Sequence, residues 1–153
     1  MSNITTVILA AGKSSRFKGS KSKLLFPLCG LPIISHIYEV ARKISGKNII
    51  VVCNEDNITE LKPILKNCKF VIQKNQLGTA HALEQTKYKI NTENILVLFG
   101  DTPLIETSNL KKLIKKFNSS KSIASIIAFK TANPYGYGRI ITDNKNLKEI
   151  IEE

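Results

Sequence analysis

A basic segment with small residues, close to the N-terminus, carries the residue types that bind phosphate. Residues 9–23 read LAAGKSSRFKGSKSK and follow a short apolar run that is typical of a buried strand. Ala10, Ala11 and Gly12 have almost no side-chain bulk, so backbone N–H groups there can approach a ligand closely. The cations that follow are Lys13, Arg16, Lys18, Lys21 and Lys23. This pattern favours a phosphate site at the mouth of a parallel sheet over a solvated basic loop.

A carboxylate follows a second apolar run. Residues 95–104 read ILVLFGDTPL, so Asp101 comes just after a predicted buried strand. A carboxylate in this place suits a metal-bound phosphate, because magnesium often takes one or two carboxylates and completes its shell with phosphate and water. Asp-Thr-Pro is also good turn chemistry, and this segment alone does not decide between the two. The basic loop after the first strand favours the metal site.

A third segment has the groups that read a nucleobase. Residues 73–81 are QKNQLGTAH. The Gln73 amide pairs a donor with an acceptor, and Gly78-Thr79 begins a predicted helix whose first N–H groups are free to face a ligand. The alternative is structural, with Gln73 as a polar strand end and Thr79 as a helix N-cap. By itself the segment favours the structural interpretation.

Other polar features give weaker signals. Residues 134–140 are PYGYGRI, in which two glycines flank Tyr137, and this predicts a tight ligand-binding turn or the entrance of a hairpin. His36 and His81 lie on predicted helices without partners at metal-ligand spacing. We therefore expect each to be a packed or surface histidine.

The elements that must position these residues alternate between strands and helices. The predicted strands are 5–9, 48–53, 69–72, 94–99 and 122–129. The predicted helices open at Pro32-Ile33, cover about 57–66, run from Gly78 to Tyr88, and follow Ser108. This order predicts an α/β fold with an open, mostly parallel sheet and helices on both faces. Such sheets bind ligands at the carboxyl ends of their strands.

Composition narrows the class of protein. The 153 residues suit one globular domain, and a net charge of +11 suits nucleotides and sugar phosphates. Lysines between 111 and 116 alternate with apolar residues at helical spacing and lack interleaved aromatics, so we expect a solvated helix face and no nucleic-acid partner. The sequence shows no membrane-length apolar run and no secretory signal, and its three cysteines are widely spaced. We expect a cytoplasmic protein without a membrane partner.

The order of segments resembles a known family. LAAGKSSRF, KLLFPLCGLPIISHI, QLGTAHAL, FGDTPLI, GYGRI and LKEIIEE together resemble the sugar-phosphate nucleotidyltransferases over essentially the whole chain. The similarity is greatest to the uridylyltransferase domain of bifunctional N-acetylglucosamine-1-phosphate uridyltransferases. It implies a Rossmann-like fold of the nucleotide-diphospho-sugar transferase type. It also implies the conversion of UTP and N-acetylglucosamine 1-phosphate to UDP-N-acetylglucosamine, a precursor of the cell wall, and pyrophosphate.

The resemblance also implies roles for single residues. Leu9, Ala10, Ala11 and Gly12 match the loop that holds the nucleotide. Arg16 and Lys23 match the cations on its phosphates, and Asp101 matches the magnesium ligand. Gln73, Gly78 and Thr79 match uracil-site residues, and Gly138 and Glu152 match contacts to the amino sugar.

The chain also departs from the family. The family domain is longer, and no hexapeptide repeats follow, so we expect one incomplete nucleotidyltransferase domain over 1–153 and no acetyltransferase half. Phe99 stands where relatives often have tyrosine. Two alternatives stay open: a weak or inactive nucleotide-binding remnant, and a cytidylyl- or guanylyltransferase. We expect an uncovered sheet edge or apolar patch near 94–99 and 122–129, and therefore self-association or a completing chain.

Overall fold

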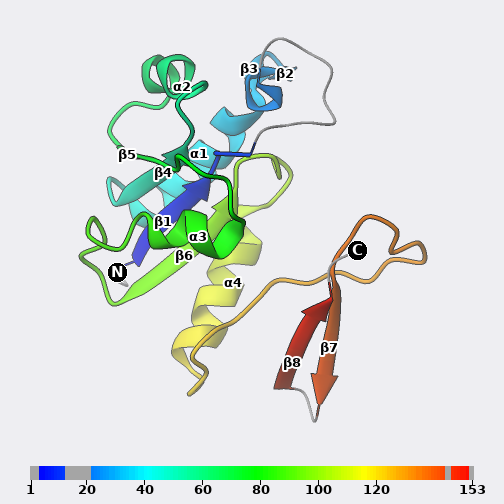
Figure 1. The fold of residues 1–153 in the computed structure, drawn as a ribbon. Coiled ribbons are helices and arrows are strands. Elements are labelled where there is room, and N and C mark those ends of the chain that lie inside the picture. Colours follow the sequence, from blue (N-terminus) through cyan, green and yellow to red (C-terminus); the bar gives the residue numbers. More distant parts are fainter. Residues whose placement is uncertain (1–3, 13–21, 144–145, 152–153) are drawn as a thin grey trace. The chain divides into compact units, whose positions relative to one another are not determined.

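The computed structural model describes residues 4–12, 22–143 and 146–151 (Figure 1). The chain divides into two compact units, Met1–Lys111 and Lys112–Glu153. The first unit holds a four-stranded sheet and a small two-stranded one, and the second unit holds a hairpin. No helix of the described residues is long and apolar enough to cross a membrane.

The main sheet of the first unit is parallel throughout. Its strands are β1 (Ile4–Leu9), β4 (Ile49–Cys53), β5 (Lys69–Ile72) and β6 (Asn94–Phe99), in the order β5-β4-β1-β6. The predicted bounds match at β5 and β6 and differ by one residue at β1 and β4. β1 and β4 are runs of apolar and β-branched residues buried along nearly their whole length, as expected for inner strands of a parallel sheet.

Among the described residues, three helices connect successive strands of this sheet, and a fourth follows its last strand. They are α1 (Ile33–Ser45), α2 (Ile58–Ile64), α3 (Thr79–Glu84) and α4 (Thr107–Asn118), and α4 crosses the boundary between the two units. Pro32 is the N-cap of α1 rather than its first residue. α3 is shorter than predicted, because the chain continues as turns from Gln85 to Lys89. Between β1 and α1 lie a 3₁₀ turn (Lys23–Leu25) and the short strands β2 (Pro27–Leu28) and β3 (Leu31–Pro32).

Both faces of the sheet carry a helix, as the sequence predicted (Figure 1). On one face Thr6 Oγ1 lies 2.5 Å from the hydroxyl of Ser45, the last residue of α1. On the other face Val7 packs in an apolar cluster with Ala82 of α3. Because side chains alternate along a strand, these contacts place α1 and α3 on opposite faces of β1.

The prediction of a strand at 122–129 is wrong. This segment has no strand assignment, and Ile123 and Phe129 are 101% and 65% exposed. A strand needs a hydrogen-bonding neighbour, and none of the described strands pairs with the segment. β6 is at one edge of the sheet and pairs with β1 alone among the described strands, and the expectation of an uncovered edge there stays a prediction.

The second unit contains an antiparallel hairpin that the sequence indicated only as an alternative. β7 (Arg139–Asp143) pairs with β8 (Asn146–Ile151), with a register shift between Ile141 and Thr142. The segment PYGYGRI therefore leads into a hairpin. Gly136 lies just before it with a φ of 80°, the left-handed conformation that favours glycine.

Candidate functional site

A cavity of about 270 Å³ opens at the carboxyl ends of β1 and β6 in the first unit. It is lined by Leu9, Ala10, Ala11, Gly12, Lys23, Leu24, Gln73, Gln76, Gly78, Thr79, Ala82, Phe99 and Asp101. Every site residue that the sequence predicted within the described part of the first unit is among them. The fold thus gathers residues from four separate stretches of chain into one pocket.

The strand order explains why the pocket forms here. From β1 the chain adds β4 and then β5 on one side, and then returns to place β6 on the other side of β1. Open α/β sheets have a crevice at the point where the strand order reverses. The two strand ends are joined there by a hydrogen bond of 2.9 Å from the Gly100 amide to the Leu9 carbonyl. A Cβ on Gly100 would lie 3.2 Å from that carbonyl oxygen, a tight contact, so a side chain here would require the two strand ends to move slightly apart.

Two buried asparagines hold the small-residue loop after β1. Asn57 Nδ2 donates to the Ala10 carbonyl at 2.8 Å, and Asn54 Nδ2 donates to the Ala11 carbonyl at 3.0 Å. Each asparagine also accepts from the other's backbone amide, at 3.1 and 2.9 Å. The loop carbonyls are therefore turned toward the asparagines, which suits a cavity that is to receive an anion.

Sequence reasoning missed these asparagines. Asn54 and Asn57 follow the end of β4 and are only 7% and 3% exposed. The available signal was an Asn-x-x-Asn spacing just after a buried strand. That spacing suggests local turn chemistry, whereas the partners of both side-chain amides lie more than 40 residues away in sequence.

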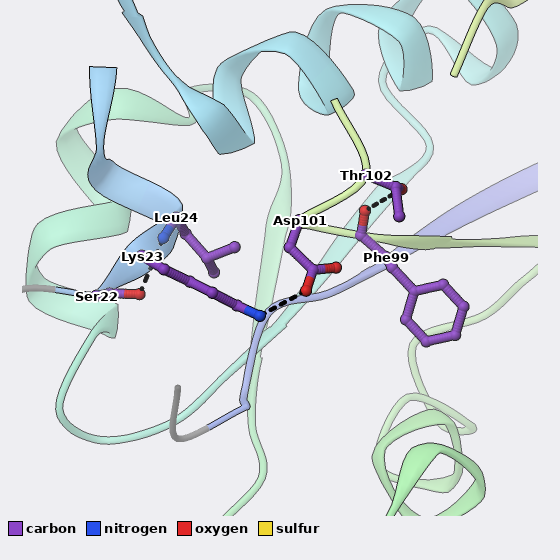
Figure 2. Close-up of polar contacts among 6 residues, drawn as sticks. All are labelled: Ser22, Lys23, Leu24, Phe99, Asp101 and Thr102. Carbon is purple, nitrogen blue, oxygen red and sulfur yellow. Dashed lines mark hydrogen bonds and ion pairs between the residues drawn. The ribbon is translucent and has the colours of Figure 1, made fainter. Parts of the chain in front are cut away.

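One end of the cavity carries opposite charges. Lys23 Nζ lies 2.6 Å from Asp101 Oδ2 (Figure 2). Lys23 begins the 3₁₀ turn, which Ser22 caps by accepting from the Leu24 amide, and Asp101 follows β6. The two side chains are 40% and 41% exposed, so water competes for both charges. Nearby, the half-exposed Phe99 ring lines the cavity, and the Phe99 carbonyl accepts from the Thr102 hydroxyl at 2.9 Å.

The other end of the cavity is a hydrogen-bonded network around Gln73. This side chain is only 2% exposed although it lines the cavity. Its Nε2 donates to the Gly78 carbonyl at 3.3 Å and lies 3.0 Å from His81 Nδ1. Gln76, which also lines the cavity, donates from its side chain to the Gln73 carbonyl at 3.0 Å. Sequence reasoning did not single out Gln76.

Gly78 makes the turn that brings this network to the helix α3. Its φ of 103° lies in the region that L side chains rarely adopt, and it is the N-cap of α3. The structural alternative for Thr79 is therefore wrong, since Thr79 is the first helical residue and not the cap. Its role at a uracil site stays a prediction, as do the roles of Gln73 and Gly78.

The two histidines differ. His36 Nε2 lies 2.8 Å from the Leu28 carbonyl, which is the packed arrangement that the sequence predicted. His81 is half-buried and is also packed as predicted, but its contact is to Gln73, which lines the cavity. Cys53 and Cys68 offer no reactive thiolate, because burial raises the pKa of each thiol to about 11.

The remaining predicted site residues are Gly138, Arg16 and Glu152. Gly138 belongs to the second unit and directly precedes β7, and its contact to a sugar stays a prediction. Arg16 and Glu152 lie outside the described residues. Within the described residues no three His, Cys, Asp or Glu side chains form a group that could hold a metal ion.

Comparison with known proteins identifies relatives along nearly the whole chain. A family model of the MobA-like NTP transferase domain matches residues 6–144. The bifunctional protein GlmU of Clostridioides difficile is 37% identical over 153 residues, which are 99% of this chain and 33% of that protein. GlmU of Campylobacter fetus is 37% identical over 157 residues, covering 100% and 35%. The chain therefore spans about a third of the length of these relatives.

Solved structures confirm the fold. A Bacillus anthracis protein assigned as a glucose-1-phosphate thymidylyltransferase has a TM-score of 0.86 at 19% identity, covering 97% of this chain and 64% of that one. A CMP:2-keto-3-deoxy-manno-octonic acid synthetase complexed with CTP has a TM-score of 0.64 at 24% identity, covering 76% and 48%. The chain has the nucleotide-diphospho-sugar transferase fold that the sequence predicted.

Proposed function

Since the chain belongs to the family of MobA-like NTP transferase domains, we propose that it transfers UMP from UTP to N-acetylglucosamine 1-phosphate. The products are UDP-N-acetylglucosamine and pyrophosphate. The observation that carries the proposal is one cavity in which the small-residue loop, the Lys23–Asp101 pair and Gln73 meet. The identity to GlmU proteins over nearly the whole chain favours this substrate pair.

The phosphate end provides the charges that this reaction needs. A phosphate oxygen of the sugar attacks the α-phosphorus of UTP, the bond to the bridging oxygen breaks, and pyrophosphate leaves with the bonding electrons. The attacking oxygen is already anionic, so no general base is required. The barrier comes from bringing two anions together, and Lys23 beside the loop lowers it by neutralising charge on the transferred phosphate. The loop holds the nucleotide for in-line attack.

The charged end also suits a magnesium ion. Asp101 offers a hard oxygen ligand, and a cation already lies 2.6 Å from its Oδ2 in the form of the Lys23 ammonium. One carboxylate is enough for magnesium when phosphate oxygens and water complete the shell. When bound, magnesium would add positive charge beside the triphosphate. Asp101 would hold the ion, and the cavity would orient the nucleotide next to it.

The network end suits uracil. Both contacts of the Gln73 side chain use its Nε2 atom, which leaves the Oε1 acceptor for a ligand. Uracil presents a donor at N3, whereas cytosine presents an acceptor there. A Gln73 amide whose Oε1 faces N3 would therefore accept a hydrogen bond from uracil and meet another acceptor in cytosine. This distinction favours uridylyl transfer over cytidylyl transfer.

Calorimetry with each nucleoside triphosphate in the presence of magnesium tests the binding part of the proposal. We expect UTP to bind more tightly than CTP, ATP and GTP. Equal binding of all four would remove the uracil site, and no binding would remove the phosphate loop. Pyrophosphate release with N-acetylglucosamine 1-phosphate, compared with glucose 1-phosphate, tests turnover and the choice of sugar.

A nucleotide-binding domain completed by a second chain is the other candidate. It is favoured by the single pairing of β6 among the described strands and by the exposure of Ile123 and Phe129. Uncovered edges and apolar side chains recruit partners. Sedimentation across a concentration series, with and without UTP, tests it. A monomer that turns over at every concentration would exclude this candidate.

A further inference from the structure

The imidazole of His81 lies between two glutamine amides. Its Nδ1 is 3.0 Å from Gln73 Nε2, and its Nε2 is 3.2 Å from Gln85 Nε2. A neutral imidazole has one donor nitrogen and one acceptor nitrogen, so it accepts a hydrogen bond from only one of these amides. One glutamine must therefore present its oxygen to the ring instead.

The surroundings decide which glutamine keeps its nitrogen toward the ring. The Gly78 carbonyl only accepts, so the Gln73 atom 3.3 Å away from it must be the nitrogen. Reversing the Gln73 amide would set two oxygens against each other at a side chain that is 2% exposed, and buried unpaired polar groups are costly.

The Gln85 amide can be reversed at less cost. Gln85 is half-buried, so a displaced amide nitrogen can bond to water. Reversal would also bring Gln85 Oε1 close to the His81 carbonyl, which its Nε2 contacts at 3.2 Å. That carbonyl keeps the Gln85 backbone amide as a donor at 3.3 Å, and the half-buried side chain can turn away from it toward water, which the buried Gln73 cannot do. His81 Nδ1 therefore accepts from Gln73, and its Nε2 carries the proton toward Gln85 Oε1.

We propose that His81 is a positioning residue for nucleobase recognition. Its Nδ1 holds the nitrogen end of the Gln73 amide away from the ligand, so that Oε1 is the atom that meets the base. The inference rests on the proposed function, because it explains how Gln73 selects uracil. Without His81, only the Gly78 carbonyl still fixes the orientation of the Gln73 amide, so turning the amide nitrogen toward the base costs less free energy. Discrimination between UTP and CTP would then weaken.

The test compares the dissociation constants of UTP and CTP for His81→Phe and for the unmodified chain. We expect the preference for UTP to fall about two- to tenfold, the contribution of one neutral hydrogen bond. Binding of inorganic tripolyphosphate, which has no base, should stay within about twofold. His81→Asn should restore much of the preference, because its Oδ1 can replace Nδ1 as an acceptor.

Gln85→Ala is the matched control, since it removes the amide on the other side of the ring. It should keep the preference for UTP. The ¹⁵N chemical shifts of the ring give a second readout, and we expect the Nε2–H tautomer. An unchanged UTP preference in His81→Phe, an equal loss of UTP, CTP and tripolyphosphate binding, or the Nδ1–H tautomer would each overturn the inference. If the unmodified chain itself has no preference for UTP over CTP, the result contradicts the proposed function itself, whatever the His81 variants show.

Discussion

The two ends of the cavity are built in different ways. At the network end, Gln73 is buried and its amide is held by two hydrogen bonds within the protein. At the charged end, Lys23 and Asp101 contact each other while both remain about two-fifths exposed. Buried polar groups are costly to leave unpaired, whereas exposed ion pairs contribute little and exchange partners readily.

This difference corresponds to two tasks. The recognition of a base needs a fixed pattern of donors and acceptors, which a buried network supplies before the ligand arrives. The binding of phosphates and a metal ion needs charges that can change partners. In the proposed reaction, Asp101 would have to release the Lys23 ammonium to hold a metal ion, and Lys23 would have to leave Asp101 to meet a phosphate. An exposed pair permits both exchanges at small cost.

The largest expected effect is on turnover, at the charged end. Lys23→Ala and Asp101→Asn should each lower kcat by roughly 10²–10³, the scale for losing one preorganised charged group. Lys111→Ala, an exposed lysine on α4, is the control and should leave kcat unchanged. Steady-state pyrophosphate release measures kcat for the two site variants and for the control. If kcat changes less than about threefold in either site variant, that residue lacks its assigned role.

The next effect is on the stability of the loop that both ends share. Asn57→Ala removes the donor to the Ala10 carbonyl and the acceptor for the Asn54 backbone amide. Ala10, Asn54 and Asn57 are all buried. Leaving such groups unpaired should lower the free energy of unfolding by about 2 kcal/mol or more. It should also weaken UTP binding, because the loop loses its support.

Asn109→Ala serves as the matched control, because Asn109 is exposed on α4 and a surface change of this kind stays within about 0.5 kcal/mol. Urea denaturation measures the stability of both variants. Equal stability of Asn57→Ala and Asn109→Ala would mean that the asparagines do not hold the loop.

Most of the strands and helices that position the site could be predicted from the sequence. The bounds of β5 and β6 could be predicted because apolar residues stand between clear turn residues. Small residues after β1 and a carboxylate after β6 are local signals, and the parallel order brings them to one edge. The prediction of a strand at 122–129 failed because an apolar composition is typical of a strand but does not indicate whether a neighbouring strand is available to pair with it.

The hydrogen bonds that support the site were not predictable in the same way. Asn54 and Asn57 reach loop residues 43 and 47 positions earlier, and no local pattern encodes such a contact. His81 was predicted to be a packed or surface histidine because no partner stands at metal-ligand spacing, and its contacts to Gln73 and Gln85 give no such signal. Sequence patterns identify groups that touch a ligand more readily than groups that orient them.

A smaller effect is expected at the turn that joins Gln73 to α3. Gly78→Ala places a side chain at a φ of 103°, which costs roughly 1–3 kcal/mol for a residue other than glycine. The change should weaken binding of uridine, which tests the base end alone, more than binding of tripolyphosphate. Gly12→Ala is the control for stability, because a Cβ there has no neighbour within 4 Å. An equal loss of uridine and tripolyphosphate binding would show that the two ends are not independent.

The smallest expected effect is on stability at the charged end. An ion pair between groups that are 40% and 41% exposed contributes at most about 1 kcal/mol, because water and salt screen it. Asp101→Asn and Lys23→Met should therefore leave the urea midpoint nearly unchanged even though they abolish most turnover. The small remaining difference should disappear in high salt. A loss of more than about 2 kcal/mol would make the pair a structural contact, since exposed pairs do not reach that value. The charged end would then be as fixed as the network end, and the exchange of Lys23 for a metal ion would be too costly to serve the reaction.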